Sequence, residues 1–336
     1  MEPRALYNPF EQMNLDPNAC FLCGGVADET TREHVFPMWL LQREGLLDST
    51  LTLLNGTCIP YRQLTVPCCE SCNNEHLSRL ESAIERATAE GASAVRELPE
   101  ELLFQWMAKI FIGILWAELR LKADRAEIDG GPIVPPEVME EYALLHGHLQ
   151  SVRRPFVFDV PTPWSLFISE LHEFEPQLDF DYHDDVLRLC FGIRFSGVGL
   201  IACLQDNSTQ KELYGEFWEP LYGVPLHWQQ WDEMWAKVAY RNALLTRTPK
   251  YLNMLPESDE EPVHVVSLRT GGLSPDTMWD DWDQETYAQV LLTFLQQKMP
   301  WLTIDDTFVP PDQVMSWVFK PDGSVNAVDA DGKPPA

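Results

Sequence analysis

Two C-x-x-C pairs near the start of the chain constrain its fold more than any other feature. Cys20 and Cys23 form the first pair, Cys69 and Cys72 form the second, and six of the eight cysteines lie within the first 72 residues. In a reducing compartment, clustered cysteines are metal ligands more often than they are disulfides. Four thiolates in two such pairs make a closed tetrahedral zinc site, which stabilises a segment too small to bury its own core. We therefore predict structural zinc, with Cys69 favoured over Cys68 because only Cys69 gives the two-residue gap.

The composition limits the cellular location and the binding partners to be expected of the chain. The first 18 residues lack the basic-then-apolar pattern of an export signal, and the longest apolar run, Ile110–Ala117, is far shorter than a membrane span. We expect a cytoplasmic protein without membrane contact. The net charge of −28 excludes a protein that coats nucleic acid through a broad basic surface. Any contact with phosphate must be local or assisted by metal.

Hydrophobic periodicity predicts an α+β fold. Three- and four-residue spacing indicates helices, and two-residue spacing with a Ser-Gly turn indicates a β-hairpin. The predicted helices begin near Asn73 or Asn74 and cover 100–122, 138–149, 228–245 and 284–298, and the predicted strands cover 165–171 and 187–204.

Changes in composition divide the chain into four segments. We expect a Cys-rich module at 1–95, a helical region at 96–150, an α+β region without a recognisable motif at 151–310, and a loose acidic tail at 311–336. Trp228, Trp231 and Trp235 are expected in the core, since aromatic residues at helical spacing are core far more often than base-stacking platforms. Arg188 and Arg194 share one strand face, which either lines a groove or faces solvent.

A Glu-His motif lies between the two cysteine pairs, and an asparagine follows the second pair. Glu33-His34-Val35-Phe36-Pro37 lies between them, and Asn73 follows Cys72 directly. The string C-x-x-C … E-H-V-x-P … V-P-x-C-x-x-C-N resembles the zinc-ribbon branch of the HNH endonucleases, also called ββα-metal or His-Me finger nucleases, which includes phage enzymes that resolve Holliday junctions. The resemblance covers about residues 18–80. It implies a zinc-stabilised ββα-metal module at the N-terminus, ahead of a larger helical and antiparallel-sheet region.

The resemblance also implies roles for single residues. His34 would be the general base that takes a proton from water. Glu33 and Asn73 would hold one catalytic Mg²⁺ or Mn²⁺ through oxygen, and His76 would add a further contact to the cation or the phosphate. The implied activity is metal-dependent hydrolysis of phosphodiester bonds, and the implied partner is nucleic acid, with DNA the expected form. The nearest phosphate-binding side chains are those of Arg32, Arg62 and Arg79.

One position departs from the family pattern. The Asn that helps to orient the base usually stands about five residues before the third Cys, where this chain has Leu64 between Gln63 and Thr65. Either neighbour could substitute. If neither does, an alternative function is a zinc-ribbon interaction protein with a degenerate HNH site, whose C-terminal region binds a protein partner.

Overall fold

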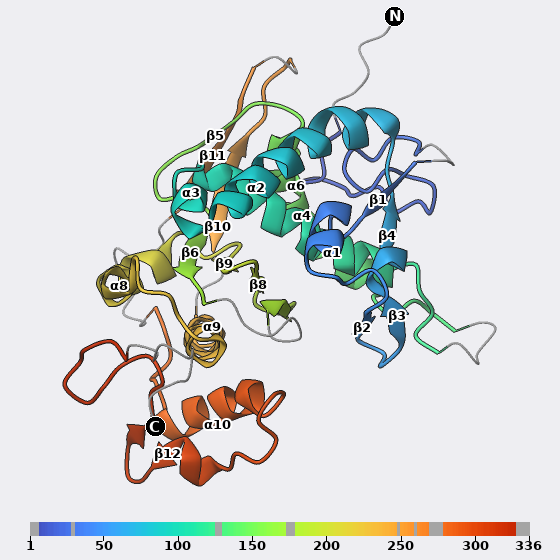
Figure 1. The fold of residues 1–336 in the computed structure, drawn as a ribbon. Helices are drawn as coiled ribbons and strands as arrows, with labels where there is room; N and C mark the ends of the chain where they lie inside the picture. Colours follow the sequence, from blue (N-terminus) through green and yellow to red (C-terminus); the bar gives the residue numbers. More distant parts are fainter. Residues whose placement is uncertain are drawn as a thin grey trace, which may run out of the picture. The chain divides into compact units, whose positions relative to one another are not determined.

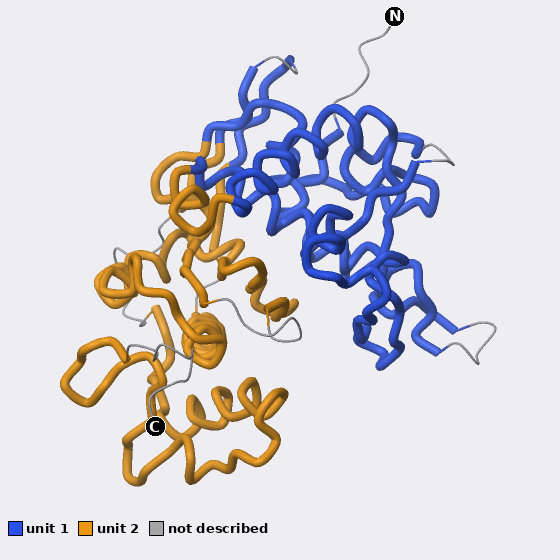
Figure 2. Tube along the Cα trace, in the orientation of Figure 1, with its two compact units in different colours: residues 1–89, 98–157, 253–264 blue, residues 90–97, 158–252, 265–336 orange. Residues whose placement is uncertain are grey.

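The computed structural model describes both helices and strands, so the predicted α+β class is confirmed (Figure 1). The chain divides into two compact units (Figure 2). Unit 1 contains the Cys-rich module together with most of the helical segment expected at 96–150. Unit 1 comprises residues 1–89, 98–157 and 253–264, and unit 2 comprises residues 90–97, 158–252 and 265–336. The residues described are 7–27, 31–124, 130–172, 179–246, 249–258, 261–268 and 278–326.

A two-stranded antiparallel sheet followed by a helix forms the N-terminal part of unit 1. Strand β1 (Arg32–His34) pairs antiparallel with β4 (Thr65–Pro67), so that His34 lies opposite Thr65 and Glu33 opposite Val66. A π-helix, η2 (Cys72–Leu77), follows β4 and continues into α2 (Ser78–Glu90). The helix predicted to begin near Asn73 is therefore present, and it ends at Glu90 because Gly91 has a φ of +98°.

The central helix of unit 1 is α4 (Glu100–Glu118), which is buried from Leu103 to Glu118. Helices that are apolar around their whole circumference belong in the interior, as the sequence predicted. Gly113 brings α4 close to the segment after β1, because a Cβ at this position would lie 3.1 Å from Val35 Cγ1. The helix ends four residues before the expected Lys122, where the chain turns.

The remaining elements of unit 1 and its neighbouring sheet are short. The helix expected at 138–149 is two helices with a turn between them, and β2 pairs with β3. A three-stranded sheet has the order β10-β11-β5. These elements are α1 (Met38–Arg43), β2 (Thr50–Thr52), β3 (Cys58–Pro60), η1 (Tyr61–Gln63), α5 (Pro136–Glu140), α6 (Ala143–Leu149), η3 (Gln150–Val152), β5 (Phe156–Phe158), β10 (Lys250–Met254) and β11 (Val263–Leu268).

Unit 2 is built on a four-stranded antiparallel sheet of order β6-β9-β8-β7. The hairpin of β8 and β9 confirms the predicted one, but β8 starts later than predicted. Leu189 has a φ of +54° and Leu187 is 78% exposed, so both belong to the turn before β8. The strands are β6 (Ser165–Glu170), β7 (Asp181–Asp185), β8 (Cys190–Phe195) and β9 (Val198–Cys203).

Both faces of β8 and β9 are covered, whereas the sequence left open whether the face of Arg188 and Arg194 lines a groove or is solvated. Every residue of the two strands is buried, and Arg194 is 0% exposed. Trp231 and Trp235 of α9 (Trp228–Ala243) cover this sheet, and an added Cβ at Gly199 would lie 2.4 Å from Trp231 Nε1. The Trp228, Trp231 and Trp235 stripe is therefore core, as predicted.

The C-terminal segment corrects the prediction of a loose tail from residue 311. Val318 is fully buried in the same hydrophobic cluster as Trp231 and Trp235 of α9. Glu233 of α9 accepts hydrogen bonds from Ser316 Oγ at 2.6 Å and from the Val318 amide at 3.1 Å. These buried polar contacts fix a segment whose acidic, Pro- and Gly-rich composition is typical of a loose tail. Residues 327–336 lie outside the described residues. The other elements here are α3 (Ala92–Arg96), α8 (Thr209–Trp218), η4 (Glu219–Leu221), α10 (Gln284–Leu295), η5 (Ile304–Asp306), β12 (Phe308–Val309) and β13 (Gln313–Val314).

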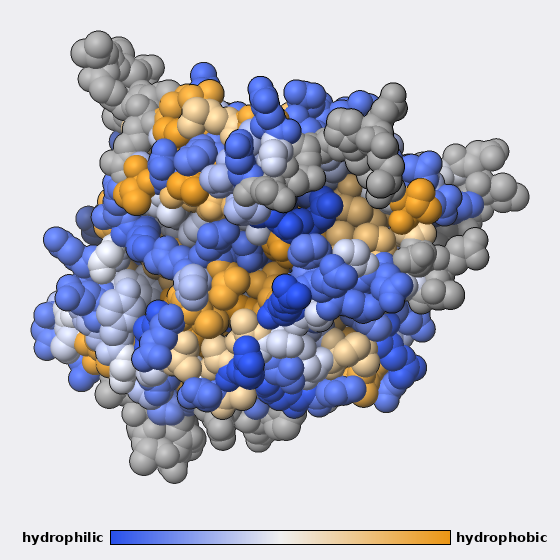
Figure 3. All heavy atoms as spheres, turned by 90° about the horizontal axis from the view of Figure 1, so that it is seen from above, coloured by the Kyte–Doolittle hydropathy of each residue, from blue (hydrophilic) through white to orange (hydrophobic). Residues whose placement is uncertain are grey.

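Hydrophilic residues dominate the face drawn in Figure 3, and hydrophobic residues gather on it in separate patches. Among the described residues, none of the helices is both long and apolar enough to cross a membrane.

Candidate functional site

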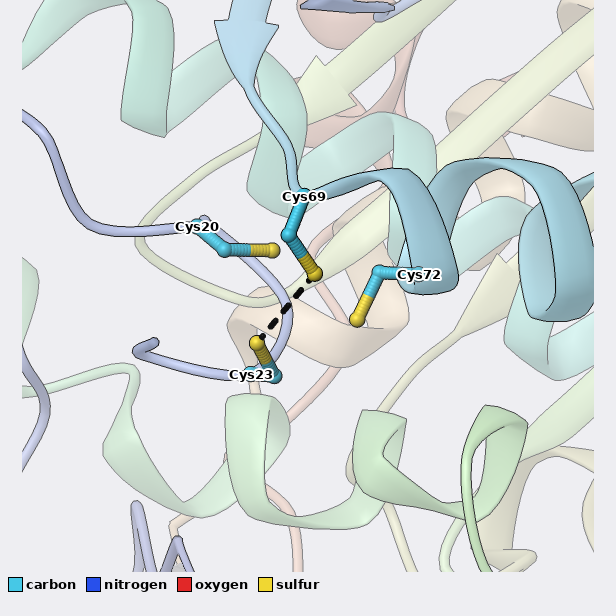
Figure 4. A group of neighbouring side chains, drawn as sticks. All are labelled: Cys20, Cys23, Cys69 and Cys72. Atoms are coloured by element: carbon cyan, nitrogen blue, oxygen red, sulfur yellow. Dashed lines mark hydrogen bonds between the residues drawn. The ribbon is translucent and has the colours of Figure 1, made fainter. Parts of the chain in front are cut away.

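Four cysteine side chains converge on one point in unit 1 (Figure 4). Cys20, Cys23, Cys69 and Cys72 have sulfur atoms that all lie within 4.8 Å of one another, and Cys23 Sγ lies 3.7 Å from Cys69 Sγ. A tetrahedral zinc ion with Zn–S bonds of ~2.3 Å places its sulfurs ~3.8 Å apart. The group can therefore hold a metal ion such as zinc. Cys68 Sγ lies 3.9 Å from Cys20 Sγ, but it is not a member of the converging four.

Each cysteine pair is placed by a local turn. Cys20 donates its amide to the Gly25 carbonyl at 2.7 Å, and Gly24, with a φ of +63°, closes the turn by donating to the Cys20 carbonyl at 2.9 Å. Cys69 and Cys72 lie where β4 leads into η2. Hydrogen bonds from Cys23 and the other neighbouring thiols lower the pKa of the Cys20 thiol, which favours the thiolate form that binds metal.

Two buried side chains support the first turn from behind, and sequence reasoning missed both. His146 of α6 has Nε2 2.7 Å from the Phe21 carbonyl oxygen, and Gln150 Nε2 donates to the Leu22 carbonyl at 2.7 Å. Burial lowers the pKa of His146 to about 4, so its imidazole is neutral and its Nε2–H is the donor. These contacts fix the backbone between Cys20 and Cys23. The only sequence signal was the pair of histidines in a predicted helix.

Glu33 is held by the ammonium group of Lys109. The Lys109 side chain is 1% exposed, and its Nζ lies 2.5 Å from Glu33 Oε1 and 2.8 Å from Glu81 Oε1. It also donates to the His34 carbonyl at 2.7 Å and to the Val35 carbonyl at 3.1 Å. Lys109 therefore ties β1 and α2 to α4 through four oxygen contacts.

Burial sets the protonation of this cluster. It raises the pKa of Glu33 to about 7; Lys109 opposes the rise, and the carboxylate of Glu81 adds to it. Burial also disfavours the charge on Lys109, but the two carboxylates outweigh it and raise the pKa of the ammonium. Lys109 is thus a permanent cation here, and Glu33 is the group that takes up a proton near neutral pH.

His34 has the surroundings of a neutral imidazole. Burial and then the charge of Lys109 lower its pKa, although Glu81 partly offsets the effect. Thr65 of β4 lies directly opposite His34 of β1, and its Oγ1 accepts a hydrogen bond from Arg32 Nε at 2.8 Å. Gln63 is exposed in η1. Of the two residues considered in place of the family's central Asn, Thr65 is therefore the one paired with His34.

The other predicted ligands lie in η2. Asn73 is its second residue, and its amide donates to the Cys69 carbonyl at 3.0 Å. His76 lies near the backbone of Val152 and near Arg153, and burial followed by the Arg153 charge lowers its pKa. Two groups of Cys, His or carboxylate side chains in the described part of the chain have ligand atoms within 4.8 Å of one another, and neither includes Glu33 or His76.

The second of these groups lies in unit 2 and was not predicted. His183 Nε2 lies 3.4 Å from Asp232 Oδ1 and 3.7 Å from Asp181 Oδ2. Lys298 contacts both carboxylates, and Arg194 lies 3.3 Å from Asp181 Oδ2. Two positive side chains thus already balance two negative ones, which disfavours a metal ion. We interpret this group as a buried ion-pair network that stabilises the core.

Comparisons with protein-family models, with curated proteins and with solved structures found no match to this chain.

Proposed function

We propose that the protein is a metal-dependent endonuclease of the HNH type, with structural zinc on Cys20, Cys23, Cys69 and Cys72. One observation carries the proposal. His34 ends β1, its partner strand β4 runs into the second cysteine pair, and the helix that begins there carries Asn73 as its second residue. This is the strand, strand and helix order that the motif implies, with the cysteines joining its two ends.

In this proposal His34 acts as the general base. Its lowered pKa keeps the imidazole neutral and able to accept a proton from water at neutral pH. The Lys109 contact to the His34 carbonyl fixes the backbone from which the imidazole extends. Arg32 lies on the strand face of His34, two residues away, where a phosphate could be bound.

The four thiols fit zinc in number, type and spacing, whereas Glu33 fits the catalytic cation only in part. Mg²⁺ or Mn²⁺, when bound, would supply Lewis-acid stabilisation of the leaving oxygen. Glu33 is 6% exposed, and its Oε1 already contacts Lys109. Cation binding therefore requires Glu33 to leave Lys109, and we assign no hydrolytic step to the ion.

The contact between Glu33 and Lys109 favours the second candidate, a zinc-ribbon interaction protein without catalysis. Glu33 is held by a buried ammonium, and the charge of Arg153 acts on His76, which leaves Asn73 as the remaining predicted ligand. In this case unit 2 would bind a protein partner, which suits the net charge of −28 better than a nucleic acid does.

A cleavage assay separates the two candidates. Purified full-length protein is incubated with plasmid, single-stranded DNA and RNA, with Mg²⁺, Mn²⁺ or chelator, beside His34→Ala and the matched control His264→Ala. The endonuclease proposal expects cation-dependent cleavage that His34→Ala abolishes and His264→Ala retains, with zinc content unchanged in both. Undiminished cleavage by His34→Ala would refute the assignment. Absence of cleavage on every substrate, with zinc bound, would favour the interaction protein.

A further inference from the structure

A cavity of about 720 Å³ lies within unit 2, apart from the cysteine cluster. Its wall combines two basic side chains of α9 with aromatic side chains from α8, α10 and the C-terminal segment. Cavities of ~300–1,000 Å³ are the usual size of small-molecule sites. The residues that matter here are Tyr214, Lys237, Arg241, Trp282, Tyr287 and Phe319.

The two basic side chains are one helical turn apart and are available for a ligand. Lys237 and Arg241 lie on the same face of α9, and in the described part of the chain neither forms an ion pair. Glu233, one turn before Lys237, also lines the cavity, but both of its carboxylate oxygens accept hydrogen bonds from residues 316–318. Asp312 is exposed at the edge. These hydrogen bonds leave the negative charge of Glu233 in place, and it interacts with Lys237, so the cavity wall carries both positive and negative side chains.

Aromatic rings surround these cations. The Arg241 guanidinium carbon lies 4.6 Å from the Trp282 ring centroid, and Arg241 Nε donates to Tyr214 Oη at 3.3 Å. Lys237 Nζ lies 5.7 Å from the Tyr287 ring centroid. Such contacts hold the cations in place without neutralising their charge. The wall therefore offers positive charge and flat apolar surface together.

A buried hydroxyl group supplies independent support. Tyr287 lines the cavity and is 4% exposed, yet its Oη has no hydrogen-bond partner in the described residues. Buried hydroxyl groups are nearly always hydrogen-bonded, since an unsatisfied one costs free energy. An oxygen-rich ligand in the cavity would accept this hydrogen bond after the Tyr287 ring turns toward it, because the oxygen itself is not exposed to solvent.

We propose that this cavity binds a phosphomonoester attached to a flat ring, with a nucleoside 5′-monophosphate as the representative ligand. A phosphate dianion matches the charges of Lys237 and Arg241 and accepts the hydrogen bond of Tyr287. The ring stacks on the aromatic wall, where Tyr214 and Phe319 are partly exposed. The net charge of −28 repels a long polyanion more strongly than a small anion, which favours a mononucleotide over a nucleic-acid strand.

Isothermal titration calorimetry on the full-length protein tests the proposal with AMP, adenosine and inorganic phosphate as separate probes. We expect AMP to bind more tightly than either part alone. Lys237→Met and Arg241→Met should each weaken AMP binding about tenfold or more, since each removes a charge-assisted contact. Lys250→Met makes the same charge change on β10 and should leave binding unchanged. Tyr287→Phe should weaken binding several-fold without lowering the Tm.

Three results would overturn the proposal: no AMP binding at millimolar concentration, equal AMP affinity in wild type and both methionine variants, or inorganic phosphate binding as tightly as AMP. The proposal does not depend on the endonuclease activity. His34→Ala should therefore bind AMP as wild type does, whatever the outcome of the cleavage assay.

Discussion

Replacing Lys109 by Met tests how strongly the buried cation holds unit 1 together. Methionine keeps the length of the side chain but removes the charge that contacts Glu33 and Glu81. Removing one partner of a buried ion pair costs about 3–5 kcal/mol, because the remaining charge is left unpaired. Glu81 is 18% exposed and can be partly hydrated, which favours the lower half of this range. At ~3 °C per kcal/mol for a domain of this size, we expect the Tm to fall by about 10 °C.

The loss should depend on pH, and its sign follows from Glu33. Burial raises the pKa of Glu33 from its ordinary value of 4.5 to about 7. Between these two pH values Glu33 is protonated in the folded protein and ionised in the unfolded chain. Protonation removes the unpaired charge, and the destabilisation by Lys109→Met should therefore be largest near pH 8 and shrink toward pH 5.5.

Differential scanning calorimetry of four proteins measures the effect. Wild type and Lys109→Met are compared with Lys122→Met, the matched control on an exposed lysine, and with a triple variant that adds Glu33→Gln and Glu81→Gln. The triple variant buries no unpaired charge and should recover most of the lost stability. A loss below about 1 kcal/mol at pH 8, or a larger loss at pH 5.5, would refute the reasoning. Added Mn²⁺ should raise the Tm of Lys109→Met more than that of the other three proteins, because only that variant frees two carboxylates for a cation.

Three further predictions concern other parts of the molecule. Cys72→Ser should reduce bound zinc, measured by mass spectrometry, from about one ion per chain to almost none. Burial lowers the pKa of His148 to about 4, so only the unfolded chain binds its proton between pH 6.5 and 4. Its contribution to the unfolding free energy should fall by up to about 3 kcal/mol as the pH drops through that interval, and His148→Asn should flatten this part of the urea-unfolding profile. Gly199→Ala places a Cβ 2.4 Å from Trp231 Nε1 and should cost about 1–3 kcal/mol by calorimetry. Gly215→Ala on α8, where a Cβ meets nothing within 4 Å, should be neutral or stabilising.

Local spacing was sufficient to predict the cysteine group and most elements. A C-x-x-C pair places two thiols on one turn whatever surrounds it, and the fold had only to bring two such turns together. The tryptophan stripe was equally direct, since three- and four-residue spacing puts its rings on one face of α9. Predictions of this kind depend only on residues that are close together in the sequence, and their spacing can be read from it directly.

Contacts between distant segments could not be predicted in this way. Lys109 stands in a helix that hydrophobicity assigns to the core, and its partners Glu33 and Glu81 come from other elements. Arg194 was assigned to an exposed or groove-lining face because a charge in a strand is usually solvated, yet Asp181 on the neighbouring strand lets it be buried. A buried charge is compensated in three dimensions, so residue type alone misplaces it.

The few cations available near His34 lead to a last prediction, on salt dependence. Arg62 is paired with Asp48 at 2.8 Å, and Arg32 donates to Thr65, so few basic groups near strands β1 and β4 can replace counterions on phosphate. If at most three cations contact phosphate, log Kd changes with log salt by a slope of ~3 or less for duplex DNA, and binding weakens about 40-fold between 50 and 200 mM salt. Proteins that make 6–10 phosphate contacts lose about 10³–10⁵ over the same interval.

Fluorescence anisotropy with a labelled duplex across a salt series measures this slope. A shallow slope would mean that the protein contacts the duplex at one or a few phosphates, as expected for the proposed site that depends on a bound cation. A slope steeper than ~6 would require a basic surface that the described residues around His34 do not supply, and would refute the view that phosphate contact is local. Arg32→Met should lower the slope by ~1, whereas Arg62→Met, which loses a cation already paired with Asp48, should change it less.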